Sequence, residues 1–114
     1  DRKEALSVLR IVPSLDDAIE ALGGRANVEL WATAARRIET SSRALTFAEA
    51  RRELEVESGK PVLILFGTGW GLASGVLSTV DALLEPIDAA TAGYNHLSVR
   101  AACAIALDRL CGAR

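Results

Sequence analysis

The most constraining feature of this chain is a short apolar run that ends in three closely spaced glycines. Residues 61–72 have the sequence PVLILFGTGWGL, in which the apolar residues 62–66 precede Gly67, Gly69 and Gly71. A short apolar run of this kind predicts a buried strand. Glycines lack a Cβ atom, so the backbone turns tightly there and approaches a bound molecule closely. We therefore expect a strand that opens into a ligand-binding loop.

Strand and helix signals alternate on both sides of this feature. Further strands are predicted at residues 8–12, 28–33 and 82–84. Ser14 with Asp17, and Thr46 with Glu49, have the spacing of capping boxes at helix starts. The helices that the sequence predicts span residues 3–6, 15–22, 46–58, 72–79 and 97–110, with a loop at 34–44.

This alternation indicates an α/β fold in one domain, residues 1–114. Strands separated by helices form a mainly parallel sheet with helices on both faces, and we expect residues 62–66 to be its central strand. Ligands bind beyond the carboxyl ends of such strands. The segments 33–37, 67–72 and 85–94 are therefore expected along one rim.

The glycine loop is also close to a dinucleotide-binding motif. That motif requires glycine where this chain has Leu72, although Glu85 follows the next strand, where a ribose-binding acid is expected. A Rossmann-like dinucleotide- or nucleotide-binding module is therefore one alternative. It is disfavoured because only one helix follows Glu85, which leaves no second half of the sheet. A purely structural turn is another alternative.

Few residues in the chain suggest acid–base or metal chemistry. His96 is the only histidine, and it has no obvious nucleophile and acid partner for a catalytic triad. Cys103 and Cys111 are eight residues apart in a predicted helix, too far for a disulfide, so we expect both to be reduced core residues. No metal site is predicted. Asn95 or Ser98 is expected to cap the last helix, whose amides favour an anion or a ligand carbonyl.

The charge balance excludes a broadly basic surface. The formal net charge is −2, unlike that of a non-specific nucleic-acid binder. Arg36, Arg37 and Arg43 form a local basic cluster, which alone is typical of a solvated loop. The longest purely apolar run is too short to span a membrane.

Three sequence blocks, taken in order, resemble a known group of enzymes. LFGTGWGL at 65–72, LEPI at 84–87 and YNHLSVRA at 94–101 resemble the SPOUT superfamily (SpoU–TrmD-like) of S-adenosylmethionine-dependent RNA methyltransferases. Within it, the chain is similar to a bacterial family related to the tRNA (guanine-N1) enzymes. The resemblance implies a C-terminal trefoil knot, S-adenosylmethionine as cofactor and tRNA or rRNA as substrate. It also implies a homodimer that forms through the last helix. The two reduced cysteines favour a cytoplasmic location.

The resemblance also implies which residues form the site. In that family, backbone groups of three loops hold the cofactor. By position, these loops contain Thr33, Ala34, Phe66, Gly67, Thr68, Gly69, Trp70, Gly71, Leu72, Glu85, Pro86, Ile87, Asn95, His96, Leu97 and Ser98. Candidates for catalysis are Glu85, His96 and Arg100. The three arginines of the basic cluster would then suit RNA phosphates.

The chain departs from the family pattern at its start. Family members carry an upstream strand and a helix with Asn and Arg residues, and the Arg is often assigned a substrate or catalytic role. This sequence starts after that point, so we expect an N-terminally truncated domain that retains the cofactor site. A SPOUT domain that only dimerises, without catalysis, is the third alternative.

Overall fold

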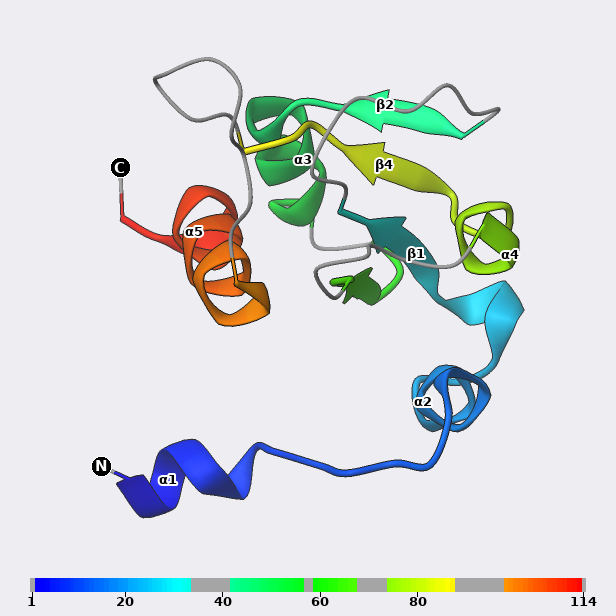
Figure 1. The fold of residues 1–114 in the computed structure, drawn as a ribbon, viewed down its shortest axis with the longest axis vertical. Helices are drawn as coiled ribbons and strands as arrows, with labels where there is room; N and C mark the ends of the chain where they lie inside the picture. Colours follow the sequence, from blue (N-terminus) through cyan, green and yellow to red (C-terminus); the bar gives the residue numbers. More distant parts are fainter. Residues whose placement is uncertain (1, 34–41, 57–58, 68–73, 88–97, 114) are drawn as a thin grey trace.

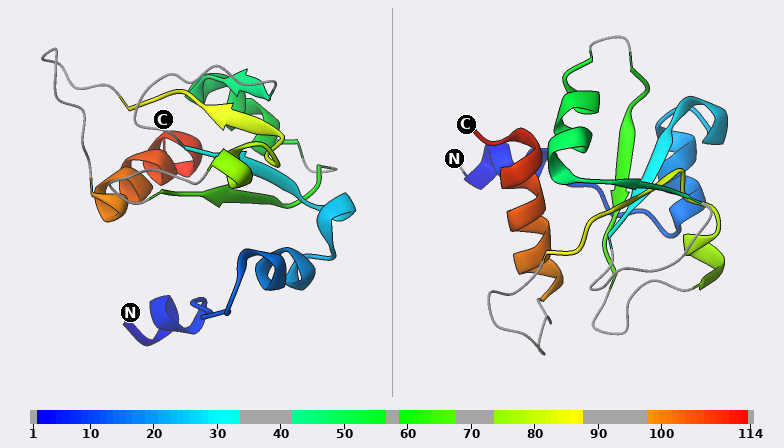
Figure 2. Two further views of the ribbon diagram at one scale, coloured as in Figure 1. Left: turned by 45° about the vertical axis from the view of Figure 1, so that its right-hand side comes forward. Right: turned by 90° about the horizontal axis from the view of Figure 1, so that it is seen from above.

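A four-stranded parallel sheet forms the centre of the fold, and helices pack on both of its faces (Figures 1 and 2). The computed structural model describes residues 2–33, 42–56, 59–67, 74–87 and 98–113. The elements in chain order are α1 (Arg2–Ser7), α2 (Leu15–Ala21), the 3-10 helix η1 (Arg25–Asn27), β1 (Glu29–Ala32), β2 (Arg43–Leu45), α3 (Phe47–Leu54), β3 (Val62–Leu65), α4 (Ser74–Leu77), β4 (Ala82–Leu84) and α5 (Val99–Cys111).

The strand order is β2-β4-β1-β3, and every neighbouring pair is parallel. Trp31 of β1 lies opposite Ile64 of β3 on one side and Ala82 of β4 on the other. The expected mainly parallel sheet is therefore confirmed, and all carboxyl ends lie along one edge. The expectation that residues 62–66 form the central strand is wrong. In the described part of the chain β3 is an edge strand, because β1 pairs with both β3 and β4.

Alternating side chains of the strands separate the core into two layers. On one face Trp31 packs with side chains of α3 and α5, and on the other Leu30 and Ala32 pack with side chains of α2 and the α4–β4 connection. The first layer is formed by Trp31, Leu45, Phe47, Ala50, Ala82, Leu84, Ala106 and Leu110. The second is formed by Ile19, Val28, Leu30, Ala32, Val80 and Leu83. This alternation is the period of two that a sheet covered on both faces requires.

Helix α3 begins at a complete capping box. The Thr46 hydroxyl accepts a hydrogen bond from the Glu49 N–H at 3.0 Å, and the Glu49 carboxylate accepts one from the Thr46 N–H at 2.9 Å. These contacts satisfy two amides at the helix start. The helix ends at Leu54, earlier than the predicted residue 58.

Helix α2 has the predicted start and end. Ser14 accepts a hydrogen bond from the Asp17 N–H at 3.2 Å, as an N-cap residue does. Its hydroxyl donates to the Asp17 carboxylate rather than completing a reciprocal box. After the helix, Gly23 and Gly24 have φ values of 105° and 92°, which side chains other than glycine rarely allow.

Helix α5 packs against α3, and contacts near its C-terminal end fix it there. Ser98 caps its start by accepting a hydrogen bond from the Ala101 N–H at 3.0 Å, so one of the two predicted caps is confirmed. Near its end, the guanidinium of Arg109 lies 5.0 Å from the ring centre of Phe47. The Arg51 side chain donates to the Arg109 and Gly112 carbonyls. The helix dipole of α5 favours a positive charge at this end.

Three local predictions are wrong. Residues 8–12 form no strand: Val8, Leu9 and Ile11 are exposed, and this segment connects α2 to α1, which lies apart from the sheet (Figure 1). A strand requires a partner, and the described residues offer none there. The predicted loop at 34–44 overlaps β2, which pairs with β4. Cys111 is exposed rather than buried, while Cys103 is half-buried.

In the described ranges, no helix combines the length and apolarity needed to cross a membrane.

Candidate functional site

The carboxyl edge of the sheet brings together residues from three predicted loops. β4, β1 and β3 are neighbours in the sheet, and they are followed directly by Glu85, Thr33 and Phe66. Segments that are more than 50 residues apart in the sequence therefore start side by side. This edge is where parallel α/β sheets bind ligands.

Thr33 joins the ends of β1 and β3. Its backbone N–H donates to the Leu65 carbonyl at 3.0 Å, and its hydroxyl donates to the same oxygen at 3.1 Å. The two bonds extend the β1–β3 ladder by one residue and fix where the chain leaves β3. Phe66 and Gly67, which come next, are half-buried.

Glu85 joins the end of β4 to the start of α3. Its backbone N–H donates to the Leu45 carbonyl at 2.9 Å, and its carboxylate accepts a hydrogen bond from the Phe47 N–H at 2.6 Å. Pro86 is then buried, and Ile87 packs against the layer formed with α3 and α5. The carboxylate is thus engaged by a helix terminus.

The other described candidates lie at the start of α5. Ser98 caps this helix, so its hydroxyl already accepts a hydrogen bond. Arg100 is exposed in the first turn.

The described part of this edge suits a ligand held by backbone groups. Thr33 and Glu85 already have protein partners, and Gly67 has no side chain. The Thr33 and Glu85 amides also donate, to the Leu65 and Leu45 carbonyls. A ligand at this edge would therefore meet mainly backbone beyond the strand ends, where glycine allows close approach.

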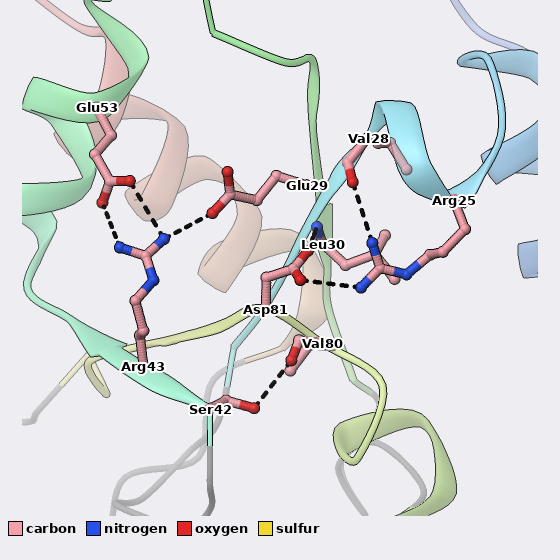
Figure 3. Close-up of polar contacts among 9 residues, drawn as sticks. All are labelled: Arg25, Val28, Glu29, Leu30, Ser42, Arg43, Glu53, Val80 and Asp81. Atoms are coloured by element: carbon pink, nitrogen blue, oxygen red, sulfur yellow. Dashed lines mark hydrogen bonds and ion pairs between the residues drawn. The ribbon is translucent and has the colours of Figure 1, made fainter.

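Arg43 lies at the opposite, amino edge of the sheet, in a cluster of paired charges (Figure 3). Its guanidinium contacts the Glu29 carboxylate at 2.7 Å and the Glu53 carboxylate at 3.3 Å. The hydrogen bond with Glu53 raises the pKa of Arg43, and the charges of both acids add to this effect. The structure therefore does not bring Arg43 to the rim that contains Thr33.

Asp81 and Arg25 form the second half of this amino-edge cluster (Figure 3). The Asp81 carboxylate accepts a hydrogen bond from the Leu30 N–H at 2.8 Å and pairs with Arg25 at 3.1 Å. Arg25 also donates to the Val28 and Thr79 carbonyls. Burial raises the pKa of Asp81, but the hydrogen bonds from Leu30 and Arg25 and the charge of Arg25 outweigh burial and lower it. An open polar hollow at this amino edge is lined by Arg25, Val28, Glu29, Arg43, Lys60 and Asp81.

Eleven predicted site residues lie outside the described residues and remain predictions. They are Ala34, Arg36, Arg37, Thr68, Gly69, Trp70, Gly71, Leu72, Asn95, His96 and Leu97. Within the described ranges, no group of three His, Cys, Asp or Glu side chains is arranged to hold a metal ion.

Two contacts of this region had no signal in the sequence. The bond between Phe47 and Glu85 joins residues 38 positions apart, and that between Leu30 and Asp81 joins residues 51 positions apart. A capping box is visible because its residues are three positions apart, whereas these pairings depend on the strand order.

A family model and curated relatives match nearly the whole chain. Residues 1–112 match the family model described as SAM-dependent RNA methyltransferase. The chain is 43% identical over 115 residues to a tRNA (guanine-N(1)-)-methyltransferase of Nitratidesulfovibrio vulgaris (strain Hildenborough), covering 98% of this chain and 25% of that protein. It is 38% identical over 112 residues to an uncharacterized protein of Aquifex aeolicus (strain VF5), covering 96% and 52%. The chain thus spans about a quarter of the first relative and half of the second.

A solved structure supports the fold. TrmJ from Z. mobilis ZM4 superimposes with a TM-score of 0.75 over 98% of this chain and 47% of that one, at 13% sequence identity. At this identity the likeness concerns the fold alone.

Proposed function

The chain belongs to the family of SAM-dependent RNA methyltransferases, and from this premise we propose that it forms the cofactor-binding part of an enzyme that methylates tRNA or rRNA. The observation that carries the proposal is the meeting of Thr33, Phe66 and Glu85 at the carboxyl ends of three adjacent parallel strands. This arrangement supports a bound nucleoside at the edge where α/β sheets bind ligands.

The proposed cofactor contacts are mainly backbone groups. The described residues that take part are Thr33, Phe66, Gly67, Pro86 and Ile87, with Glu85 and Ser98 beside them. The proposal adds the predicted residues of the glycine loop and of segment 95–97. S-adenosylmethionine, when bound, supplies a methyl group on a positively charged sulfur, which is reactive without a metal.

The task left to the protein is alignment of the acceptor atom with that methyl group, and removal of a proton where the acceptor carries one. Of the three candidates from the sequence, Glu85, His96 and Arg100, we retain His96 and Arg100 for these tasks. Arg100 is exposed at the start of α5, where a cation is able to contact an RNA phosphate. The carboxylate of Glu85 already accepts the Phe47 amide, which weakens its candidacy as a base.

We also propose the trefoil knot and a homodimer through α5. Ala106 and Leu110 of this helix are buried against the core, whereas Val99 and Leu107 are 42% and 49% exposed. Together with Cys103 and Cys111 they follow each other at intervals of four residues, so they form one stripe on the helix. An exposed stripe that contains apolar and small polar side chains supports a helix contact between two copies.

RNA binding and a cytoplasmic location complete the proposal. Arg36 and Arg37 remain the proposed phosphate contacts, while Arg43 is the weakest of the three because it pairs with two carboxylates on the opposite edge. No observation favours the Rossmann-like alternative. A domain that dimerises without binding the cofactor would bind none of the three ligands in the following test.

Calorimetry tests the proposal directly. The folded chain is titrated with S-adenosylhomocysteine, NAD and ATP, and we expect binding of S-adenosylhomocysteine alone. Gly69→Val should abolish that binding because it adds a side chain to the glycine loop. Gly75→Ala is the matched control, since its added Cβ meets no atom within 4 Å. Binding of NAD in preference to S-adenosylhomocysteine would establish the Rossmann-like alternative.

A further inference from the structure

We propose that Glu85 is a positioning residue, which fixes the start of the third loop to the N-terminus of α3, and not a general base or a ribose ligand. The inference deepens the proposed function and rests on it, because the loop that begins at Glu85 is one of the three proposed cofactor loops.

The geometry ties Glu85 to both sides of one turn. Its backbone N–H donates to the carbonyl of Leu45, the last residue of β2, and its carboxylate accepts from the N–H of Phe47, the first residue of α3. Only Thr46 lies between these two partners. The carboxylate oxygen lies 2.6 Å from the Phe47 nitrogen.

The Phe47 amide has no other acceptor among the contacts at this helix start. The capping box satisfies the amides of Thr46 and Glu49 within the segment itself. Phe47 depends instead on a residue 38 positions away. A carboxylate at this place also gains from the positive end of the helix dipole. The bond therefore joins a local helix signal to a distant loop.

Helix α3 is held in place because α5 packs along it. The Phe47 ring is buried in the core and contacts the Arg109 guanidinium of α5, and Arg51 binds the carbonyls at the end of α5. The chain on both sides of segment 88–97 therefore contacts α3. Glu85, before the segment, bonds to α3, and α5, after it, packs on α3. The Glu85 carboxylate bonds to the start of α3, and Pro86 and Ile87 continue the chain from there.

Three variants of the full chain test the assignment. Glu85→Gln keeps an oxygen that accepts the Phe47 amide and removes only the charge, whereas Glu85→Ala removes the acceptor. Glu49→Ala is the matched control, because it removes the other acidic acceptor at the same helix terminus without touching the loop. The first readout needs no ligand: hydrogen exchange of the Phe47 amide, and the NMR shifts of the Ile87 amide. The second is affinity for S-adenosylhomocysteine.

For the positioning role, Glu85→Ala should lose protection at Phe47, shift Ile87 and bind S-adenosylhomocysteine about tenfold more weakly, since a less populated loop geometry lowers apparent affinity in proportion. Glu85→Gln should keep the Ile87 shift and the affinity of the wild type, with only a small loss of protection at Phe47 because the charge no longer favours the helix dipole. Glu49→Ala should lower the melting temperature without moving Ile87 or the affinity.

Two results would overturn the assignment. If Glu85→Gln loses affinity as Glu85→Ala does while Phe47 stays protected, then the charge acts on the ligand directly. If Glu85→Ala leaves Ile87 and the affinity unchanged, then the bond positions nothing. A wild type that fails to bind S-adenosylhomocysteine, with Ile87 shifted in Glu85→Ala alone, supports the positioning role and refutes the proposed cofactor instead.

Discussion

Replacing Asp81 with alanine tests how the amino edge of the sheet holds β4 beside β1. The Asp81 carboxylate accepts the Leu30 amide at 2.8 Å and pairs with Arg25 at 3.1 Å. In Asp81→Ala the Leu30 amide, which is partly buried, loses its acceptor, at a cost of about 1–3 kcal/mol. The ion pair adds less, about 0.2–1 kcal/mol, because both of its side chains are roughly 40% exposed.

The two terms are separated by a matched variant. Asp81→Asn keeps an oxygen that accepts the Leu30 amide, so it should cost no more than about 1 kcal/mol, the value of the ion pair. Asp81→Ala should cost about 2–3 kcal/mol. Urea unfolding at neutral pH, followed by circular dichroism, measures both free energies of unfolding. The reasoning fails if the two variants lie within about 0.5 kcal/mol of each other, the usual scatter of surface substitutions.

The same contact predicts a pH dependence. The pKa of Asp81 lies below its ordinary value of 3.8 in the folded chain. A carboxyl whose pKa falls on folding adds stability above the unfolded pKa, and this stability is lost as pH falls through the folded pKa. The difference in stability between wild type and Asp81→Asn should therefore shrink below about pH 4. A constant difference from pH 7 to pH 2 would mean that the carboxylate charge is irrelevant.

Three further predictions use the same unfolding assay. Gly112→Ala should destabilise by about 1–3 kcal/mol, because the added Cβ would lie 2.5 Å from a backbone carbonyl oxygen of α5. The added Cβ of Gly75→Ala meets no atom within 4 Å, so this variant should be neutral or stabilising by up to about 1 kcal/mol. Val28→Ala, in the core, should cost about 2 kcal/mol, whereas Ile11→Ala, at a fully exposed position, should cost under about 0.5 kcal/mol. Thr46→Ala should cost about 1 kcal/mol by removing the cap of α3. Equal losses of stability in the two glycine variants, or in Val28→Ala and Ile11→Ala, would contradict the packing described above.

Much of the fold was predictable because its signals are local. The capping box of Thr46 and Glu49 and the double glycine after α2 are short patterns whose hydrogen-bond partners lie within five residues. The strands at 29–32 and 82–84 were visible as apolar runs. These features depend on backbone geometry and nearby side chains, so the sequence determines them without knowledge of the fold.

The errors concern pairing between distant segments. Residues 8–12 have strong β propensity, but in the described part of the chain no strand lies beside them. The weaker segment Arg43–Leu45 becomes β2 because the edge of β4 is available and Leu45 is buried there. The place of β3 at an edge is likewise set by which strands pair with β1. β propensity describes how well a residue fits a sheet, but it does not show which strand lies beside it.

The candidate site divides in the same way. The glycine loop and the acid after β4 were visible in the sequence, and the structure brings the starts of both loops to one edge with Thr33. The engagement of the Glu85 carboxylate by α3, and of Arg43 by two acids at the other edge, were not visible. Both depend on contacts between residues at least ten positions apart. These contacts change the role we assign to each side chain.

The central claim is that the three loop starts at the carboxyl edge form one cofactor site, and NMR mapping tests it most directly. S-adenosylhomocysteine is added to the uniformly labelled chain while amide shifts are recorded. We predict the largest changes at Thr33, Gly67 and Ile87, and none at Arg25 or Arg43 on the amino edge. Changes confined to the amino edge, or an unperturbed spectrum of the folded chain at saturating ligand, would contradict the account.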